Sequence, residues 1–351
     1  MPRVALLLLG LIILLPSCRK AQSGESGVSP SSSSVSVKPQ GRAYFDLFDT
    51  VSYIYSYKGD GEEEFLENAD EAYYTLFRFH RLFDIYHEYE GINNLCTINS
   101  NPGVEIEVDD EIIEFLDYAR KMSEVTGGRM DVMMGSVLSI WHDARYSEEP
   151  YLPSSEELEE ADQYTGFDFL EIDREKKTVK LLSDKASLDV GALGKGYAAE
   201  KAAEVLEEKG VESYVLNIGG NIRIIGSKTD GSGWRTGVKD PKNPDSAFVV
   251  VLSLKDTSCV TSGSYERYFT VDGVRYSHII DPETLYPARY FDSVTVVTKN
   301  SALADALSTA LFCMPYEEGA ALALSLSVDV VWVFTDGSVR YTEGIKALLI
   351  E

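Results

Sequence analysis

Positive charge is scarce in this 351-residue chain. Lysine and arginine number 32 against 57 aspartates and glutamates, which gives a net charge of −25 and an isoelectric point of about 4.5. No basic patch stands out, so the sequence argues against binding of nucleic acid through phosphate neutralisation. An acidic protein that handles a polyanion needs a metal ion or local backbone donors instead.

Cysteine is equally sparse. The chain has four cysteines and no C-x-x-C pair, which argues against a structural zinc site. Cys96, Cys259 and Cys313 are far apart in the sequence, and an odd number of thiols permits at most one disulfide among them. We therefore expect these three to be mostly buried thiols.

The chain begins with an apolar run that is too short to cross a bilayer as a mature helix. It extends from Val4 to Leu15 after a single Arg3, and this length is typical of a signal-peptide core. Cys18 follows directly after Leu15-Pro16-Ser17, a pattern that resembles the lipobox of bacterial lipoproteins. We expect a signal peptide over residues 1–17 and a lipid on Cys18, which would anchor an exported protein to the membrane facing the periplasm or the outside. Simple secretion with cleavage near Ser17 is the alternative.

The rest of the chain divides into a short tether and one large domain. Residues 18–41 are rich in Ser, Gly, Pro and Gln and predict a flexible tether, and residues 42–351 predict the folded domain. Apolar periodicity in that domain predicts helices over 65–83, 109–125 and 194–208 and a helix pair from Ser301. Strand signals cover 44–57, 167–188, 214–218 and 237–297, and 147–161 predicts an acidic surface excursion. Because no regular βαβ rhythm appears, the fold class is α+β.

The densest candidate site is a glycine-rich turn between a strand and a helix. It has the sequence S-L-D-V-G-A-L-G-K-G-Y over residues 187–197, and such turns bring backbone N–H groups and a helix N-terminus close to an anionic ligand. The turn is not a P-loop, because Asp189 and Gly196 stand where that motif requires glycine and Ser or Thr. Packing alone would also explain glycines at such a junction.

Two further stretches carry side chains suited to chemistry. In A-D-A-L-S-T-A, helical spacing puts Asp305 and Thr309 on one face, where their hard oxygens would suit Mg²⁺. The alternative is a structural aspartate and a threonine bonded back to a carbonyl. His278 lies between short strands ahead of the turn signal Asp281-Pro282, and its imidazole would suit proton removal near neutral pH, or packing.

Taken together, these stretches resemble the FAD:protein FMN transferases of the ApbE family. The resemblance covers residues 44–345 and rests on seven segments in the family's order: F-D-T, T-G-G-R-M-D, L-D-V-G-A-L-G-K-G-Y-A, L-N-I-G-G-N, T-S-G-S-Y-E-R-Y, H-I-I-D-P and A-D-A-L-S-T-A. Phe48-Asp49 departs from the family's Met-Gly, and Ser264 stands where an aspartate is common.

The resemblance implies a fold and a set of site residues. The fold would have mixed or antiparallel sheets flanked by helices, in two closely packed lobes with the flavin site between them. The Ala192 carbonyl and the Asp305 and Thr309 side chains would hold Mg²⁺. The residues expected to contact FAD are Phe48, Tyr86, Arg129, Met130, Asp131, Asp189, Lys195 and Ile279.

The implied activity is Mg²⁺-dependent transfer of FMN from FAD to a Thr or Ser hydroxyl of an acceptor flavoprotein, with release of AMP. His278 is the candidate base, and Asp305 the candidate catalytic carboxylate. Tyr86 would stack on the flavin, which favours transfer, because the hydrolytic members of the family carry a smaller polar residue there. The alternatives are a FAD pyrophosphatase that yields FMN and AMP, and a flavin-binding lipoprotein without catalysis.

Overall fold

A computed structural model describes residues 39–243, 245 and 247–350. The predicted signal peptide, Cys18 and most of the predicted tether lie outside the described residues. Strand β1 begins at Gln40, two residues before the start expected for the domain. No helix among the described residues has the length and apolar character to span a membrane.

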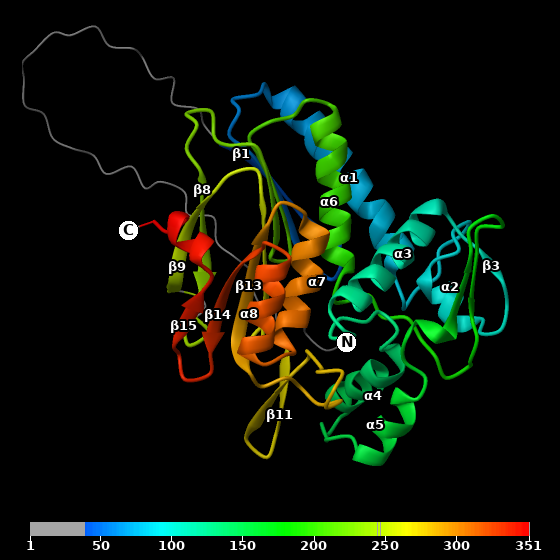
Figure 1. Ribbon diagram of the computed structural model, residues 1–351. Helices are drawn as coiled ribbons and strands as arrows, with labels where there is room; N and C mark the ends of the chain where they lie inside the picture. Colours follow the sequence, from blue (N-terminus) through cyan, green and yellow to red (C-terminus); the bar gives the residue numbers. More distant parts are fainter. Residues whose placement is uncertain (1–38, 244, 246, 351) are drawn as a thin grey trace, which may run out of the picture.

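One large antiparallel sheet organises the fold (Figure 1). Every strand pairing in it is antiparallel, which fits the predicted α+β class. In spatial order its strands are β1 (Gln40–Leu47), β2 (Thr50–Ser56), β6 (Tyr214–Ile218), β7 (Asn221–Ile225), β10 (Ser258–Gly263), β13 (Phe291–Thr298), β14 (Asp329–Phe334) and β15 (Val339–Tyr341).

The two faces of this sheet enter different hydrophobic cores, as the two-residue period of a strand requires. In β6, Leu216 belongs to the main core and Val215 to a second core, and Val330 and Val331 of β14 divide in the same way. The main core is covered by helices α1 (Glu62–Phe83), α6 (Gly194–Glu208), α7 (Ser301–Phe312) and α8 (Tyr316–Ser325). The second core is closed by the pair β8 (Trp234–Lys239) and β9 (Phe248–Leu254) and by the 3-10 helix Glu343–Ala347.

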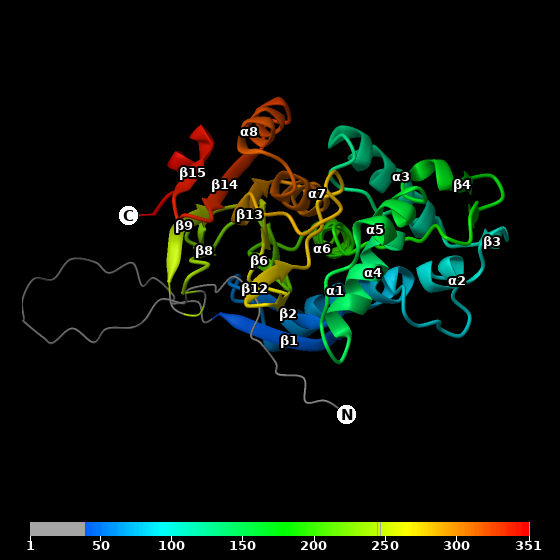
Figure 2. The same cartoon turned by 90° about the horizontal axis from the view of Figure 1, so that it is seen from below.

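A smaller, mainly helical lobe packs beside α1 and α6 (Figures 1 and 2). Its helices are α2 (Leu95–Ser100), α3 (Asp110–Val125), α4 (Gly135–Tyr146) and α5 (Ser155–Asp162). A three-stranded sheet completes it, with β3 (Ile106–Glu107), β5 (Thr178–Leu181) and β4 (Leu170–Asp173) in that order, preceded by the 3-10 turn Phe167–Phe169. Phe115 and Leu116 of α3 lie in the main core together with Leu216, so the two lobes share one apolar interior.

A third, small core joins the helical lobe to the other side of the molecule. Trp141 of α4 packs with Phe269 in the hairpin of β11 (Tyr268–Val271) and β12 (Val274–Ser277). The Trp141 indole N–H also donates to the Leu285 carbonyl at 2.9 Å. The segment after β12, which includes His278, is thereby held against α4.

The first hairpin contains an unusual turn. Leu47 pairs with Thr50, which leaves Phe48 and Asp49 as a two-residue connection with φ of 52° and 50°. Two consecutive positive φ values match the turn that suits a twisted hairpin, although Asn and Gly are its preferred residues. Phe48-Asp49, which replaces the Met-Gly of the family, therefore forms a tight turn in which Asp49 is exposed.

Candidate active site

The glycine-rich turn meets α7 through one backbone hydrogen bond. The Gly196 N–H donates to Oδ2 of Asp305 at 2.7 Å. Gly196 is the third residue of α6, and an N–H in the first turn of a helix has no carbonyl partner within that helix. Asp305 satisfies this N–H from α7, and the Ala192 carbonyl accepts no hydrogen bond among the residues described here.

A glycine is required at this contact. A Cβ placed on Gly196 would lie 2.3 Å from the Asp305 Cβ and 2.5 Å from the Ser301 carbonyl oxygen. Both neighbours are parts of α7 that cannot rotate away. The second glycine of G-K-G therefore lets α6 and α7 approach closely enough for Asp305 to reach the first turn of α6.

Asp305 is a buried carboxyl with an unusual pKa. Its residue is 5% exposed. Burial raises the pKa of Asp305 to about 6, while the Lys195 charge and the Gly196 N–H act in the opposite direction. A divalent cation would oppose the same desolvation more strongly, because it favours the ionised carboxylate.

Thr309 lies one turn along α7 from Asp305 and is half-buried. Its hydroxyl lies 3.4 Å from the Ser262 hydroxyl of β10, which in turn lies 2.8 Å from Ser308 Oγ. The predicted metal set thus consists of one free carbonyl, one carboxylate and one hydroxyl. No group of three His, Cys, Asp or Glu side chains suited to a metal occurs in the described part of the chain, so a metal here would depend on this mixed set.

Asp189 and Lys195 lie at the two ends of the turn. Oδ1 of Asp189 accepts the Gly191 N–H at 2.8 Å, and Lys195 Nζ donates to the Gly191 carbonyl at 3.3 Å. Burial raises the pKa of Asp189, against the effects of the Gly191 N–H and the charges of Lys195, His142 and Arg145. The turn therefore carries one carboxyl and one ammonium group on a backbone that both of them brace.

His278 is fixed in one orientation. Nδ1 lies 3.0 Å from the Arg267 carbonyl, which can only accept, so the ring proton resides on Nδ1 and Nε2 keeps its lone pair. Burial lowers the pKa of His278 to about 3, helped by the charges of Arg267, Arg145 and Lys195. The imidazole is consequently neutral at physiological pH and can accept a proton, but a pKa this far below 7 makes it a weaker base than an ordinary histidine.

The residues expected to contact FAD divide into two groups. Tyr86 is 59% exposed, and its ring lies 5.9 Å from that of His142 in α4. Burial raises the pKa of Tyr86, and the nearby Asp189 carboxylate raises it further. Phe48 packs edge-on against the His80 ring, and its N–H donates to Nδ1 of that ring. Ile279 is buried directly after His278.

The second group lies in the T-G-G-R-M-D segment, where Arg129 and Met130 make contacts within the protein itself. Arg129 Nη1 donates to Asp281 and to the Cys313 carbonyl, and its other nitrogen meets Glu283. Met130 is 1% exposed in the main core, so only its backbone is available to a ligand. Asp131 lines an open hollow of about 750 Å³ between α3 and β4, together with Arg120 and Phe167. Of the predicted residues, this hollow includes Asp131 alone.

Sequence reasoning missed two residues of α4 whose charges act on the turn, His142 and Arg145. Both act on the pKa of Asp189, and Arg145 also acts on those of Tyr86 and His278. No local sequence motif predicts their role, because their distance from the turn depends on how the two lobes pack.

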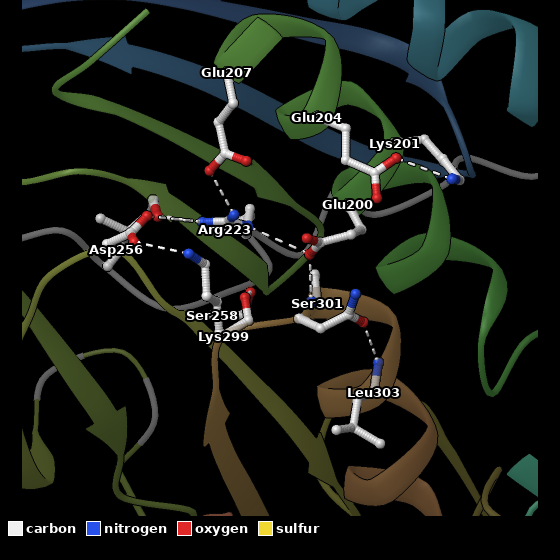
Figure 3. Close-up of polar contacts among 12 residues, drawn as sticks. Glu200, Lys201, Glu204, Glu207, Arg223, Asp256, Ser258, Lys299, Ser301 and Leu303 are labelled. Carbon is white, nitrogen blue, oxygen red and sulfur yellow. Dashed lines mark hydrogen bonds and ion pairs between the residues drawn. The ribbon is translucent and has the colours of Figure 1, made fainter. Parts of the chain in front are cut away.

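Behind the turn, a buried ion-pair network connects α6 to β7 and to the start of α7 (Figure 3). Arg223 of β7 is 1% exposed and lies between Glu200 and Glu207 of α6, at 3.3 and 2.7 Å. Glu200 also accepts the N–H of Ser301, the first residue of α7, at 2.5 Å. The network fixes the spacing of the two helices that carry Gly196 and Asp305.

Comparison with known proteins matches this architecture to one family. The model of the ApbE family matches residues 50–332. A FAD:protein FMN transferase of Treponema pallidum is 34% identical over 269 residues, covering 72% of this chain and 73% of that protein. One from Vibrio cholerae O1 is 32% identical over 240 residues, covering 68% and 70%.

Solved structures agree with the sequence comparison. The ApbE protein from Thermotoga maritima superposes with a TM-score of 0.80 at 30% identity, covering 90% of this chain and all of that one. The flavin transferase ApbE from Vibrio cholerae gives 0.75 at 26% identity, covering 89% and 99%.

Proposed function

Because the chain belongs to the ApbE family, we propose that it is a FAD:protein FMN transferase that uses Mg²⁺ to attach FMN to an acceptor flavoprotein. The relatives at 34% and 32% identity bear that enzyme name, and a matching solved structure is called a flavin transferase. The observation that carries the proposal is the Gly196–Asp305 hydrogen bond, which joins a buried carboxylate to the glycine-rich turn that contains the unbonded Ala192 carbonyl.

The residues present fit a magnesium ion. Mg²⁺ prefers a few hard oxygen ligands and retains waters and substrate phosphates for its other positions. Ala192, Asp305 and Thr309 would supply a carbonyl, a carboxylate and a hydroxyl, and the high pKa of Asp305 marks a buried oxygen that a cation would stabilise. When bound, the ion would neutralise phosphate oxygens of FAD.

The reaction is a phosphoryl-group transfer. The hydroxyl oxygen of an acceptor threonine or serine forms a bond to the FMN-side phosphorus. The bond from that phosphorus to the bridging oxygen breaks, and AMP leaves with the oxygen. His278 takes the hydroxyl proton on Nε2, which its Nδ1 contact with Arg267 leaves available. Lys195 adds positive charge at the turn, which an acidic protein must supply locally.

The partners and location follow from the same proposal. FAD is the substrate, and the acceptor is a flavoprotein subunit or an FMN-binding domain. The enzyme would be exported and held at the membrane by a lipid on Cys18, facing the periplasm or the outside. The site lies between the two lobes, where Tyr86 of the helical side and Asp189 and Lys195 of the turn would meet the flavin and the diphosphate.

One incubation tests the proposal. The purified chain is mixed with FAD, Mg²⁺ and an acceptor domain, and the acceptor is weighed by mass spectrometry. We expect one FMN phosphodiester on the acceptor. Free FMN and AMP without a labelled acceptor would indicate a FAD pyrophosphatase, and intact FAD a flavin-binding protein without catalysis.

Asp305→Ala tests the metal site in the same assay. We expect this variant to remain folded and to lose Mg²⁺-dependent transfer. Asp230→Ala is the matched control, because Asp230 is an exposed aspartate in the loop after β7. Full Mg²⁺-dependent transfer by Asp305→Ala would contradict the assignment.

A further inference from the structure

Arg145, in the last turn of α4, is an arginine without a polar partner. Within the described residues it forms no hydrogen bond or ion pair, and its Nε is buried with no acceptor. A buried donor that lacks an acceptor is costly, and such a group calls for an explanation. In a chain with a net charge of −25, carboxylates are abundant, yet none of those in the described ranges lies at ion-pair distance from this guanidinium.

A series of rings fixes Arg145 beside the proposed flavin site. The Tyr86 and His142 rings lie 5.9 Å apart, the His142 and Tyr146 rings 4.6 Å apart, and the Arg145 guanidinium carbon lies 4.7 Å from the Tyr146 ring centre. Stacking on an aromatic face restricts an arginine without using its N–H donors. Tyr146 is the next residue and 67% exposed, so this contact leaves the N–H donors of Arg145 available to a ligand.

The charge of Arg145 acts on three titratable residues of the proposed site. Burial is the largest cause of the shifted pKa values of Asp189, Tyr86 and His278, and the positive charge of Arg145 is a smaller cause in each. These three residues belong to the glycine-rich turn, the segment after α1 and the segment after β12. Arg145 therefore lies within electrostatic reach of all three residues, and it belongs to the helical lobe.

We propose that Arg145 binds the diphosphate of FAD, as a cation contributed by the helical lobe in addition to Lys195 and the Mg²⁺ ligands. This inference rests on the proposed function and names a substrate contact within it. Arg145 lies in none of the motifs that carry the family resemblance. A guanidinium presents N–H groups in a planar fork that matches phosphate oxygens, and this geometry makes a charge-assisted, two-point contact.

Paired binding measurements test the inference. Dissociation constants for FAD and for riboflavin, which has the flavin ring but no phosphate, are measured with the full chain in the presence of Mg²⁺. We expect Arg145→Gln to weaken FAD binding about tenfold or more, as the loss of a charge-assisted hydrogen bond does, and to leave riboflavin binding within about twofold. Arg145→Lys should fall between the two, because it keeps the charge and loses the fork.

The control is Arg235→Gln. It removes the same charge from an exposed residue of β8, far from α4 in both views (Figures 1 and 2). The melting temperature of each variant verifies that it is folded.

Three results would overturn the inference: equal binding of FAD by Arg145→Gln and Arg235→Gln, equal weakening of FAD and riboflavin, or a rise in the KM of the acceptor alone. Each is distinct from failure of the proposed function, in which the wild-type chain itself would not label an acceptor.

Discussion

Among single residues, Gly196 has the most demanding position in the site. Its hydrogen atom occupies the space where a methyl group would overlap Asp305 and the Ser301 carbonyl. We expect Gly196→Ala to destabilise the fold by about 2 kcal/mol, since overpacking of rigid neighbours outweighs the better helix propensity of alanine. Transfer activity should fall with it, because α6 and α7 must separate.

The comparison is Gly61→Ala. Gly61 precedes α1, has a negative φ and has nothing within 4 Å of an added Cβ. Urea unfolding should place this variant within about 0.5 kcal/mol of the wild type. Equal stability of Gly196→Ala and Gly61→Ala would contradict the close contact between the two helices.

His278 predicts a pH dependence of stability. Its folded pKa is about 3, whereas an unfolded histidine titrates near 6.5, so only the unfolded chain takes up this proton between those values. Stability is therefore present above pH 6.5 and is lost as the pH falls toward 3. Between pH 7.5 and 5 the wild type should lose roughly 2 kcal/mol more than His278→Asn, in which this titration is absent.

Urea unfolding of both proteins at the two pH values measures this difference. The other titrating groups are common to the two proteins and cancel in the comparison. Parallel losses of stability would show that His278 is protonated as readily in the folded chain as in the unfolded one.

The site residues illustrate what a sequence can and cannot predict. Asp305 and Thr309 were predictable as neighbours because helical spacing alone puts them on one face. The hydrogen bond between Gly196 and Asp305 joins positions 109 residues apart, and no local sequence pattern predicts it. Arg145 was missed for the same reason, since an arginine at the end of a helix is unremarkable until the opposing lobe is in place.

At the scale of elements, α6, β7 and α7 are joined by the buried Arg223. Its removal would leave Glu200 ionised and unpaired in a buried setting, where burial already raises the pKa of that carboxyl. We expect Arg223→Met to cost about 3 kcal/mol in urea unfolding. The double variant with Glu200→Gln should recover part of this loss, because it removes the stranded charge.

Lys201→Gln provides the surface comparison, because Lys201 pairs with Glu204 one turn away at the edge of the same helix. This change should cost less than 1 kcal/mol. If Arg223→Met proved no worse than Lys201→Gln, the network would not be what spaces α6 from α7.

Local sequence patterns predicted most of the helices and strands, and the elements they missed have physical explanations. The helix over 194–208 and the strand over 214–218 have the predicted bounds. The run 44–57, predicted as a strand, is divided into a hairpin by the turn at Phe48-Asp49, whose residues are not typical of turns. Helix α4 went unpredicted because it packs on several sides and lacks a clear polar face. Helix α5, in the supposed acidic excursion, buries only Leu158, although its Ser154–Glu157 capping box was a readable signal.

On the scale of the whole molecule, the shared interior predicts cooperative unfolding. The main core contains side chains from both lobes, and the third core adds the contacts of Trp141 with the β11–β12 hairpin. The chain has three tryptophans: Trp141 in the helical lobe, Trp234 in the β8–β9 pair and Trp332 in the large sheet. With 5-fluorotryptophan labelling, all three folded ¹⁹F signals should vanish at one urea concentration. Earlier loss of the Trp141 signal would mean that the helical lobe unfolds by itself.

The close approach at Gly196 also bears on how such an enzyme diverges. Every other amino acid at that position brings at least a Cβ into the space between α6 and α7. Substitutions of Gly196 should therefore not be tolerated during evolution. Arg145, which we propose as a substrate contact, lies on a separate helix and occupies no such gap. Randomised libraries should consequently yield altered substrate preference from the α4 rim, and only inactive proteins from the junction itself.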